Sequence, residues 1–336
     1  MQALVVRDQW LKSTSELKVN ANVPIPTLKP GQVLVKVMAV GTNFFDILMV
    51  QGKYQIKPPR PFTPGCEFAG VVVKTHPNVS HINVGTAVMG SDSWGAYAEY
   101  LAVPAKQVIP KPDALSYEEA CGLTITYPTS YAGLVYRGGL KRGDHVLIHA
   151  AAGGVGLAAV QIAKLLGATV IATVGSDAKA DIVRAQGADH VVNYRDENWP
   201  SAVAKLTPQG RGVDIVYDPV GLIERSLKCT AWNGRLIVVG FAAGQIEKVA
   251  VNRVLLKNVS IVGLHWGAYL RFEPERVPEV WGVLLPWLAQ RQLKPVVFPR
   301  VFHGLDQVGS ALDTIASRES YGKVVVKVAD PASAKL

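Results

Sequence analysis

The spacing of apolar residues divides the chain into two parts of different texture. Up to about residue 125, apolar and polar residues alternate in short runs such as "GQVLVKVMAV" and "GVVVK", separated by turns such as "KPG" and "PFTPG". An alternation with a period of two predicts strands with one buried face. This part therefore predicts a compact antiparallel β-rich domain.

After Lys141 the pattern changes to strands that alternate with helices. The strand-like "DHVLIHA" is followed by a glycine turn, the helix-like "LAAVQIAKLLG" and a second strand, "ATVIATVG". Further strand-like runs follow in "ADHVVNY", "VDIVYDPVG", "GRLIVVGF" and "VSIVGL". This alternation predicts an α/β fold with a doubly wound parallel sheet.

The last part of the chain, from about residue 275, carries a helical stretch, the strand-like "PVVFPRVF", a helix around "LDQVGSALDTIAS" and a final strand, "KVVVKV". We expect these elements to return to the β-rich domain. The predicted domains are therefore residues 1–125 with 266–336, and residues 126–265.

The composition narrows the class of protein. The chain has 336 residues, 49% apolar and 18% charged, which is typical of a globular protein of two domains. Its uncharged apolar run from Ala150 to Val160 is too short to span a membrane, and the strand-like start leaves no room for a signal peptide. Three distant cysteines favour a reducing compartment. The net charge is +9, and the lysines and arginines are scattered along the sequence. This excess indicates either attraction of an anionic small molecule or a generally basic surface.

The segment "HAAAGGVG" lies between a predicted strand and a predicted helix and has the spacing A-x-x-G-x-x-G. In this setting the glycines let the backbone approach a dinucleotide pyrophosphate at the helix N-terminus and let the helix pack closely. The alternative is a tight turn without a ligand. The candidate cofactor contacts here are Gly153, Gly154, Val155 and Gly156.

The end of the second strand, "ATVGSDAK", is where an NAD-binding site places a carboxylate on the ribose. Here Gly175 leaves space, Ser176 can donate a hydrogen bond, and Lys179 can neutralise a 2′-phosphate, which favours NADPH over NADH. Asp177 falls past the strand, where it is expected to help cap the next helix. Tyr194 can cover the adenosine phosphate from the next strand.

These features, with "GTNFFDILMVQGKY", "PGCEFAG" and "YDPVG", resemble the zinc-free quinone oxidoreductase branch of the medium-chain dehydrogenase/reductase superfamily over essentially the whole chain. The resemblance implies a Rossmann domain that binds NADPH and a GroES-like catalytic domain, with the acceptor bound in the cleft between them. It also implies a homodimer or tetramer joined near "RLIVVGF" and "VSIVGL".

Against the pattern of the zinc alcohol dehydrogenases, the three catalytic metal ligands would fall at Asn43, Cys66 and near Ile125. A catalytic zinc needs three protein ligands, and only Cys66 qualifies. No metal site is therefore predicted, and the acceptor is expected to be one that takes hydride readily, such as a quinone or a conjugated enone.

The resemblance also assigns roles to individual residues. Asn43 would hold an acceptor oxygen as well as contact the cofactor, and Tyr54 would donate a proton or hydrogen bond to the developing oxyanion. Asp46 of the same run is expected to be a structural anchor. Further cofactor contacts carry over by position to Thr129, Val220, Phe241 and Arg318.

These observations favour an NADPH-dependent quinone oxidoreductase. A 2-enoyl thioester or 2-alkenal reductase is the alternative within enzymes, and an NADPH-binding structural or RNA-associated protein is the alternative outside them. A cytoplasmic location is expected, with a peroxisomal one as the alternative because the C-terminal Ala334-Lys335-Leu336 resembles the S-K-L signal.

Overall fold

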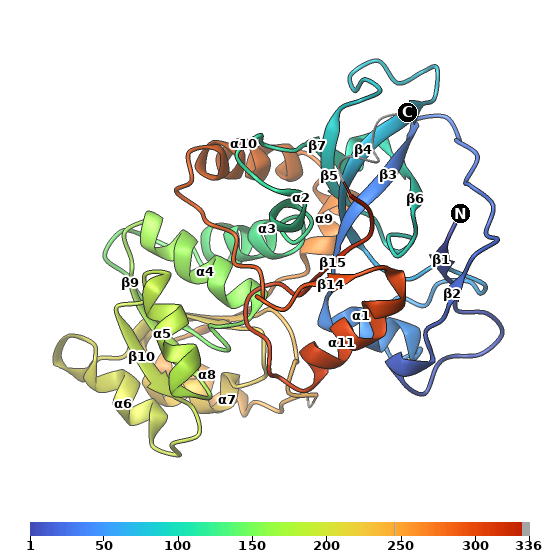
Figure 1. The fold of residues 1–336 in the computed structure, drawn as a ribbon. Coiled ribbons are helices and arrows are strands. Elements are labelled where there is room, and N and C mark those ends of the chain that lie inside the picture. Colours follow the sequence, from blue (N-terminus) through green and yellow to red (C-terminus); the bar gives the residue numbers. More distant parts are fainter. Residues whose placement is uncertain (245, 331–336) are drawn as a thin grey trace. The chain divides into compact units, whose positions relative to one another are not determined.

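We analysed a computed structural model of the chain, which describes residues 1–244 and 246–330 (Figure 1). Its internal contacts divide the chain into two compact units. Unit 1 comprises Met1–Ile125 and Pro295–Leu336, and unit 2 comprises Thr126–Lys294. In this division residues 266–294, grouped with the β-rich domain in the sequence pattern, fall in unit 2. They do so because the helix that they form packs on the first helix of unit 2, where the rings of Trp287 and Tyr131 meet edge to face.

Unit 1 is built on a seven-stranded sheet in the order β14-β15-β3-β4-β5-β7, with β6 also paired to β3. All of its pairs are antiparallel except β14 with β15. A separate antiparallel pair is formed by β1 and β2. The strands are β1 (Ala3–Leu4), β2 (Val19–Asn20), β3 (Gln32–Gly41), β4 (Glu67–Thr75), β5 (Ala87–Ser91), β6 (Tyr100–Pro104), β7 (Val108–Pro110), β14 (Phe302–His303) and β15 (Val325–Lys327). The helices are α1 (Phe44–Val50), α2 (Tyr117–Ala120) and α11 (Val308–Ala316).

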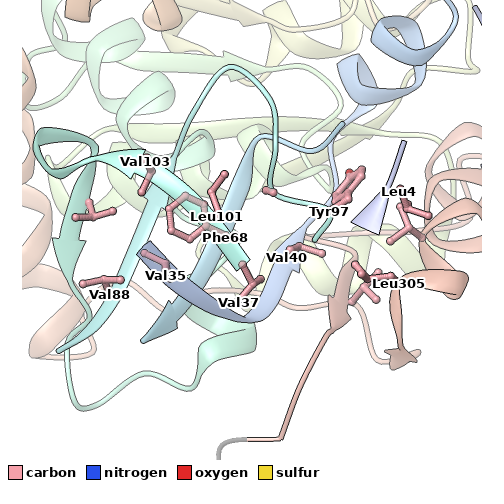
Figure 2. Packing of buried hydrophobic residues seen from close by; sticks show 14 of the residues in the cluster. Leu4, Val35, Val37, Val40, Phe68, Val88, Tyr97, Leu101, Val103 and Leu305 are labelled. Atoms are coloured by element: carbon pink, nitrogen blue, oxygen red, sulfur yellow. The ribbon is translucent and has the colours of Figure 1, made fainter. Parts of the chain in front are cut away.

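The core of unit 1 explains why its first and last segments fold together. Figure 2 shows Phe68 of β4 packed among valines of β3, with Tyr97 and Leu305 in the same cluster. Phe68 and Tyr97 are fully buried, and each such side chain contributes about 1.5–3 kcal/mol through removal of apolar surface from water. Because β15 pairs with β3, this core depends on residues nearly 300 positions apart in sequence.

Unit 2 is a six-stranded parallel sheet in the order β10-β9-β8-β11-β12-β13. The chain begins at β8 in the middle, adds β9 and β10 on one side, and then returns to add β11, β12 and β13 on the other. The strands are β8 (His145–Ile148), β9 (Thr169–Val174), β10 (His190–Asn193), β11 (Val213–Asp218), β12 (Thr230–Val238) and β13 (Ser260–Gly263). This reversal of strand order confirms the predicted doubly wound α/β fold. It puts the switch point at the carboxyl ends of β8 and β11, where ligands bind in such sheets.

The helices of unit 2 connect and cover these strands. They are α3 (Thr126–Tyr131), α4 (Gly154–Leu165), α5 (Asp177–Ala185), α6 (Trp199–Lys205), α7 (Ile223–Ser226), α8 (Val251–Lys257), α9 (Tyr269–Phe272) and α10 (Arg276–Ala289). Among residues 1–244 and 246–330, no helix combines the length and hydrophobicity needed to cross a bilayer. The tripeptide Ala334-Lys335-Leu336 lies outside the described residues, so the expected cytoplasmic or peroxisomal location stays a prediction.

Candidate functional site

The glycine turn of unit 2 follows β8 directly and leads into α4. Ala150 has a φ of 46°, and the Ala151 N–H donates to the Thr173 carbonyl on β9 at 3.0 Å. Gly153 then takes the N-cap position of α4. The turn is thereby anchored to two neighbouring strands.

Gly156 is the glycine of this turn that close packing requires. A Cβ atom at this position would lie 2.4 Å from the Ala150 oxygen and 2.7 Å from the Ala151 Cα. At Gly153 the nearest contact of a Cβ would be the Ala150 oxygen at 3.3 Å. Gly153, Gly154 and Val155 remain partly exposed, so the backbone of the first turn of α4 is accessible to an anion.

A buried histidine that the sequence analysis did not single out supports the same turn. His149 bridges Thr173 Oγ1 at 2.9 Å and Ser226 Oγ at 2.8 Å, and its ring meets Trp199 edge to face. Burial lowers the pKa of His149 to about 4, against a smaller opposing effect of Asp218. The neutral imidazole therefore ties β8 to β9 and α7 without adding charge.

The end of β9 has no room for a side chain. A Cβ atom on Gly175 would lie 2.5 Å from the Tyr194 hydroxyl oxygen, and the Tyr194 N–H donates to the Val174 carbonyl at 3.0 Å. Gly175 and Tyr194, predicted separately as cofactor contacts, are therefore neighbours. Ser176 is the N-cap of α5, and Lys179 lies in the first turn of the helix.

The expected capping role of Asp177 is corrected by this geometry. Asp177 is the exposed first residue of α5, and the N-cap position belongs to Ser176. A carboxylate in the first turn still interacts favourably with the helix dipole, so Asp177 stabilises the helix by charge rather than as its cap.

A second buried polar residue, Asp218 at the end of β11, shapes the loop of the "YDPVG" run. Its Oδ1 accepts from the backbone N–H groups of Val220 at 2.8 Å and Gly221 at 3.0 Å. The Ala243 N–H in turn donates to the Val220 carbonyl at 3.1 Å. The loops that carry Val220 and Phe241 are thus joined by their backbones at the carboxyl ends of β11 and β12.

In unit 1 the run from Asn43 to Tyr54 forms α1 and the turn after it. Asp46 is fully buried, and its Oδ2 accepts from the Asn43 backbone N–H at 2.9 Å and from the Tyr97 hydroxyl at 2.7 Å. Burial raises the pKa of Asp46 to about 6, although both hydrogen bonds oppose the rise. The expected structural role of Asp46 fits these contacts.

Beside Asp46 lies a buried ion pair that the sequence analysis missed. The Lys323 ammonium contacts Glu67 Oε2 at 2.7 Å and Asn43 Oδ1 at 2.7 Å. Glu67 is fully buried, and its other oxygen, Oε1, accepts from the Ile125 N–H at 2.7 Å. Two features of the sequence could have pointed to this ion pair. Lys323 is a charged residue at the start of the apolar run "KVVVKV", and Glu67 is a charged residue inside "PGCEFAG".

The positions of the three zinc ligands are filled in a way that does not fit a metal. The Oδ1 atom of Asn43 faces an ammonium, and the side chain of Ile125 has no donor atom. The Cys66 thiol donates to the Ser93 carbonyl at 3.0 Å, and burial raises its pKa well above the usual value, which disfavours the thiolate that a metal needs. No cluster of three or more His, Cys, Asp or Glu able to hold a metal occurs in the described part of the chain.

Tyr54 lies half-buried at the end of this run, with its ring stacked on Phe45 at a centroid distance of 5.4 Å. Burial raises the pKa of the Tyr54 hydroxyl, and the neighbouring Cys66 and Asp46 add to the rise. The phenol is therefore held in its protonated form at neutral pH, as a hydrogen-bond or proton donor must be.

The remaining candidates are distributed between the two units. Unit 1 contains Arg318, which is exposed after α11 with a φ of 60°. Unit 2 contains Thr129, half-buried in α3. In unit 1 the candidates are thus the Asn43–Tyr54 run and Arg318. In unit 2 they are Thr129 and the loops after the strands, which form the candidate nucleotide-binding edge.

The strand order of unit 2 and its glycine turn are those of a dinucleotide-binding fold, and the comparisons show that the chain is an oxidoreductase of the medium-chain dehydrogenase/reductase superfamily. Residues 29–113 match the alcohol dehydrogenase GroES-like domain, and residues 154–285 match a family described as zinc-binding dehydrogenase. The chain belongs to the quinone oxidoreductase branch of that superfamily, as the resemblance predicted.

Individual relatives agree with this assignment. The chain is 39% identical over 303 residues to a quinone oxidoreductase-like protein 2 homologue of Nematostella vectensis, covering 89% of this chain and 82% of that protein. It is similar to the structure of Escherichia coli quinone oxidoreductase complexed with NADPH, with a TM-score of 0.89, 29% identity and coverage of 97% and 100%. It is also similar to the CurF ER cyclopropanase from the curacin A biosynthetic pathway, with a TM-score of 0.86, 28% identity and coverage of 98% and 99%.

The raised pKa of Asp46 predicts a pH-dependent stability. The folded state binds the Asp46 proton more tightly than the unfolded chain, so this contribution is fully present below about pH 4. It is lost as the pH rises to about 6, and it amounts to about 3 kcal/mol. We therefore expect the free energy of unfolding of Asp46→Asn to rise by up to this amount relative to the wild type between pH 4 and 7, measured by urea unfolding.

The exposed control Asp8→Asn should have the same pH dependence of stability as the wild type. A difference between Asp46→Asn and the wild type that does not change with pH would contradict the assignment.

Close packing at the glycine turn predicts a contrast between two substitutions. Gly156→Ala forces a methyl group against backbone atoms, and we expect it to lower the free energy of unfolding by about 1–3 kcal/mol despite the higher helix propensity of alanine. Gly153→Ala meets a looser contact and should cost about 1 kcal/mol or less. Chemical denaturation of both variants measures this, and equal losses would refute the packing argument.

Proposed function

We propose that this protein is an NADPH-dependent quinone oxidoreductase that reduces its acceptor without a metal. The observation that carries the proposal is the set of residues at the former metal positions. With an ammonium-bound amide, a thiol that donates to the Ser93 carbonyl and an isoleucine there, these positions do not supply the three ligands that a Lewis-acidic zinc needs. An acceptor that takes hydride readily, such as a quinone, suits these groups.

The nucleotide-binding edge of unit 2 suits NADPH. The partly exposed backbone of Gly153, Gly154 and Val155 would hold the pyrophosphate at the start of α4. Lys179, with Ser176, Gly175 and Tyr194, would hold the 2′-phosphate, and the residues proposed for the remaining contacts are Asn43, Thr129, Val220, Phe241 and Arg318. When bound, NADPH supplies a hydride from its nicotinamide ring.

The acceptor would be held in unit 1. Asn43 would donate from its amide nitrogen to a carbonyl oxygen of the acceptor, and Tyr54 would donate to the oxygen on which negative charge develops. A phenol is protonated at neutral pH, and the raised pKa of Tyr54 favours hydrogen-bond donation over full proton transfer.

The same protonated phenol favours a second candidate, a 2-enoyl thioester or 2-alkenal reductase. Reduction of a carbon–carbon double bond needs a proton as well as a hydride, and Tyr54 is the residue that would donate it. The two functions therefore differ in how strongly they depend on the Tyr54 hydroxyl.

The functions are separated by following NADPH absorbance with 9,10-phenanthrenequinone, a 2-enal and a 2-enoyl thioester, with NADH in parallel. We expect turnover of the quinone with a preference for NADPH. Tyr54→Phe should then lose less than about 10-fold in rate, because a quinone takes hydride readily and depends less on a donor to its oxygen. A double-bond reductase would instead turn over the enal or thioester and lose about 10²-fold or more in Tyr54→Phe. Tyr100→Phe, half-buried in β6, is the matched control. Tight NADPH binding without turnover of any acceptor would favour a non-enzymatic role.

We also propose that two copies of the chain associate through unit 2. The edge strand β13 exposes Ile261, and neighbouring apolar side chains are strongly exposed: Val251 at 80%, Leu255 at 77% and Leu256 at 71%. An open edge strand beside apolar side chains is suited to pairing with a second copy.

This surface predicts a particle of twice the 36.1 kDa chain mass in light scattering after gel filtration. Leu255→Glu should shift the protein toward the monomer, because the pairing would bury an unpaired charge. Val84→Glu, at an exposed apolar residue of unit 1, should leave the mass unchanged. A wild-type monomer at all concentrations would contradict the proposal.

A further inference from the structure

The ammonium of Lys323 is buried and fully engaged. Its three acceptors are Glu67 Oε2 at 2.7 Å, Asn43 Oδ1 at 2.7 Å and the Thr42 carbonyl at 2.9 Å. A lysine ammonium has three N–H donors, so each donor has a partner. A buried charge is tolerated only with such pairing, which makes the arrangement of these acceptors a strict requirement.

Glycines make space for this ion pair. A Cβ atom at Gly122 would lie 2.8 Å from the Lys323 Cγ. A Cβ atom at Gly41 would lie 3.1 Å from Glu67 Oε2 and 2.5 Å from the Cys121 carbonyl oxygen. The methylene groups of Lys323 and the carboxylate of Glu67 thus occupy space that a side chain at Gly122 or Gly41 would otherwise fill.

Glu67 extends the network to the segment before unit 2. Its Oε1 accepts from the Ile125 N–H at 2.7 Å and from the Thr124 hydroxyl at 3.3 Å, while Oε2 accepts from Asn43 Nδ2 at 3.1 Å. The pair therefore joins the segments that contain Asn43, Cys66 and Ile125, the same three positions where zinc ligands would fall.

The two charges also fix the orientation of the Asn43 carboxamide. An ammonium can only donate, so the atom facing Lys323 must be the amide oxygen, and a carboxylate can only accept, so the atom facing Glu67 must be the amide nitrogen. Glu67 uses one N–H of Nδ2, and a carboxamide nitrogen carries a second one.

We propose that Lys323 is a positioning residue, which together with Glu67 holds Asn43 as an N–H donor and so selects acceptors that present a carbonyl-type oxygen. This inference deepens the proposed function, because it rests on Asn43 as the residue that binds the acceptor. A buried organic ion pair here joins the segments that a bound metal would join in a zinc enzyme.

The first test is kinetic. Lys323→Met removes the group that holds the amide oxygen of Asn43. We expect kcat/KM for the quinone to fall about 100-fold, and the affinity for NADPH to fall by much less, because Asn43 is one proposed cofactor contact among many. Lys327→Met, four residues further along at the end of β15 and paired with Asp330 near the surface, is the matched control and should behave as the wild type. In an Asn43→Ala background, Lys323→Met should have no further effect on kcat/KM.

A double variant separates positioning from stability. Lys323→Met with Glu67→Gln removes both charges, so it should recover much of the stability that either single variant loses. A positioning role predicts that kcat/KM for the quinone stays low in this variant, whereas a purely structural role predicts that it recovers with stability. If Lys323→Met alone does not fold, this charge-balanced variant carries the kinetic test.

A readout independent of turnover distinguishes failure of this inference from failure of the proposed function. In protein labelled with ¹⁵N-asparagine, the side-chain amide signal of Asn43, assigned by its loss in Asn43→Ser, should be protected from exchange. The protection should persist in Lys327→Met and vanish in Lys323→Met or the double variant. If protection depends on Lys323 but no carbonyl acceptor is reduced, the positioning stands and the function fails. If the quinone is reduced and both kinetics and protection ignore Lys323, the inference is overturned.

Discussion

The fully buried carboxylate of Glu67 imposes the strongest single constraint on unit 1. A charge without solvent must be matched by donors, and Glu67 receives them from Lys323, Asn43, Thr124 and Ile125. These donors come from both sequence portions of the unit. The polar network therefore specifies, alongside the hydrophobic core, how the C-terminal segment returns to β3.

Unit 2 also contains buried polar side chains that need hydrogen-bond partners, but it satisfies them without an ion pair. Asp218 uses backbone N–H groups as its donors, and His149 stays neutral between two hydroxyl groups. Both residues stand at the carboxyl ends of central strands, where the loops of a doubly wound sheet must be held for a ligand. Buried polar residues thus set loop geometry in both units, by an ion pair in one and by neutral or backbone partners in the other.

Much of the fold could be predicted from the sequence, because the period of its apolar residues is a local property. The alternating strands, the glycine turn and the order of β/α units all follow from neighbours within about 30 residues. The packing need at Gly156 was predictable for the same reason. The residues at which helices begin and end were less predictable. Asp177, for example, is the first residue of α5 rather than its N-cap.

The ion pair was not predictable, because it depends on a contact between residues 256 positions apart in the chain. Taken alone, Lys323 at the start of an apolar strand looks like a solvated edge residue, and Glu67 looks like an extension of the Cys66 motif. Only the folded chain shows that Asn43 lies between them. The role of an amide is fixed by the charges of its partners, which no local pattern encodes.

The tight contact between Gly175 and Tyr194 has a consequence for how such a protein can evolve. A carboxylate at the end of β9 is the usual way to read a ribose hydroxyl, yet any side chain at position 175 would collide with the tyrosine hydroxyl. A lineage moving toward the other dinucleotide would have to shrink or shift residue 194 as well. Positions 175 and 194 are therefore coupled, because a side chain at 175 requires the Tyr194 ring to move.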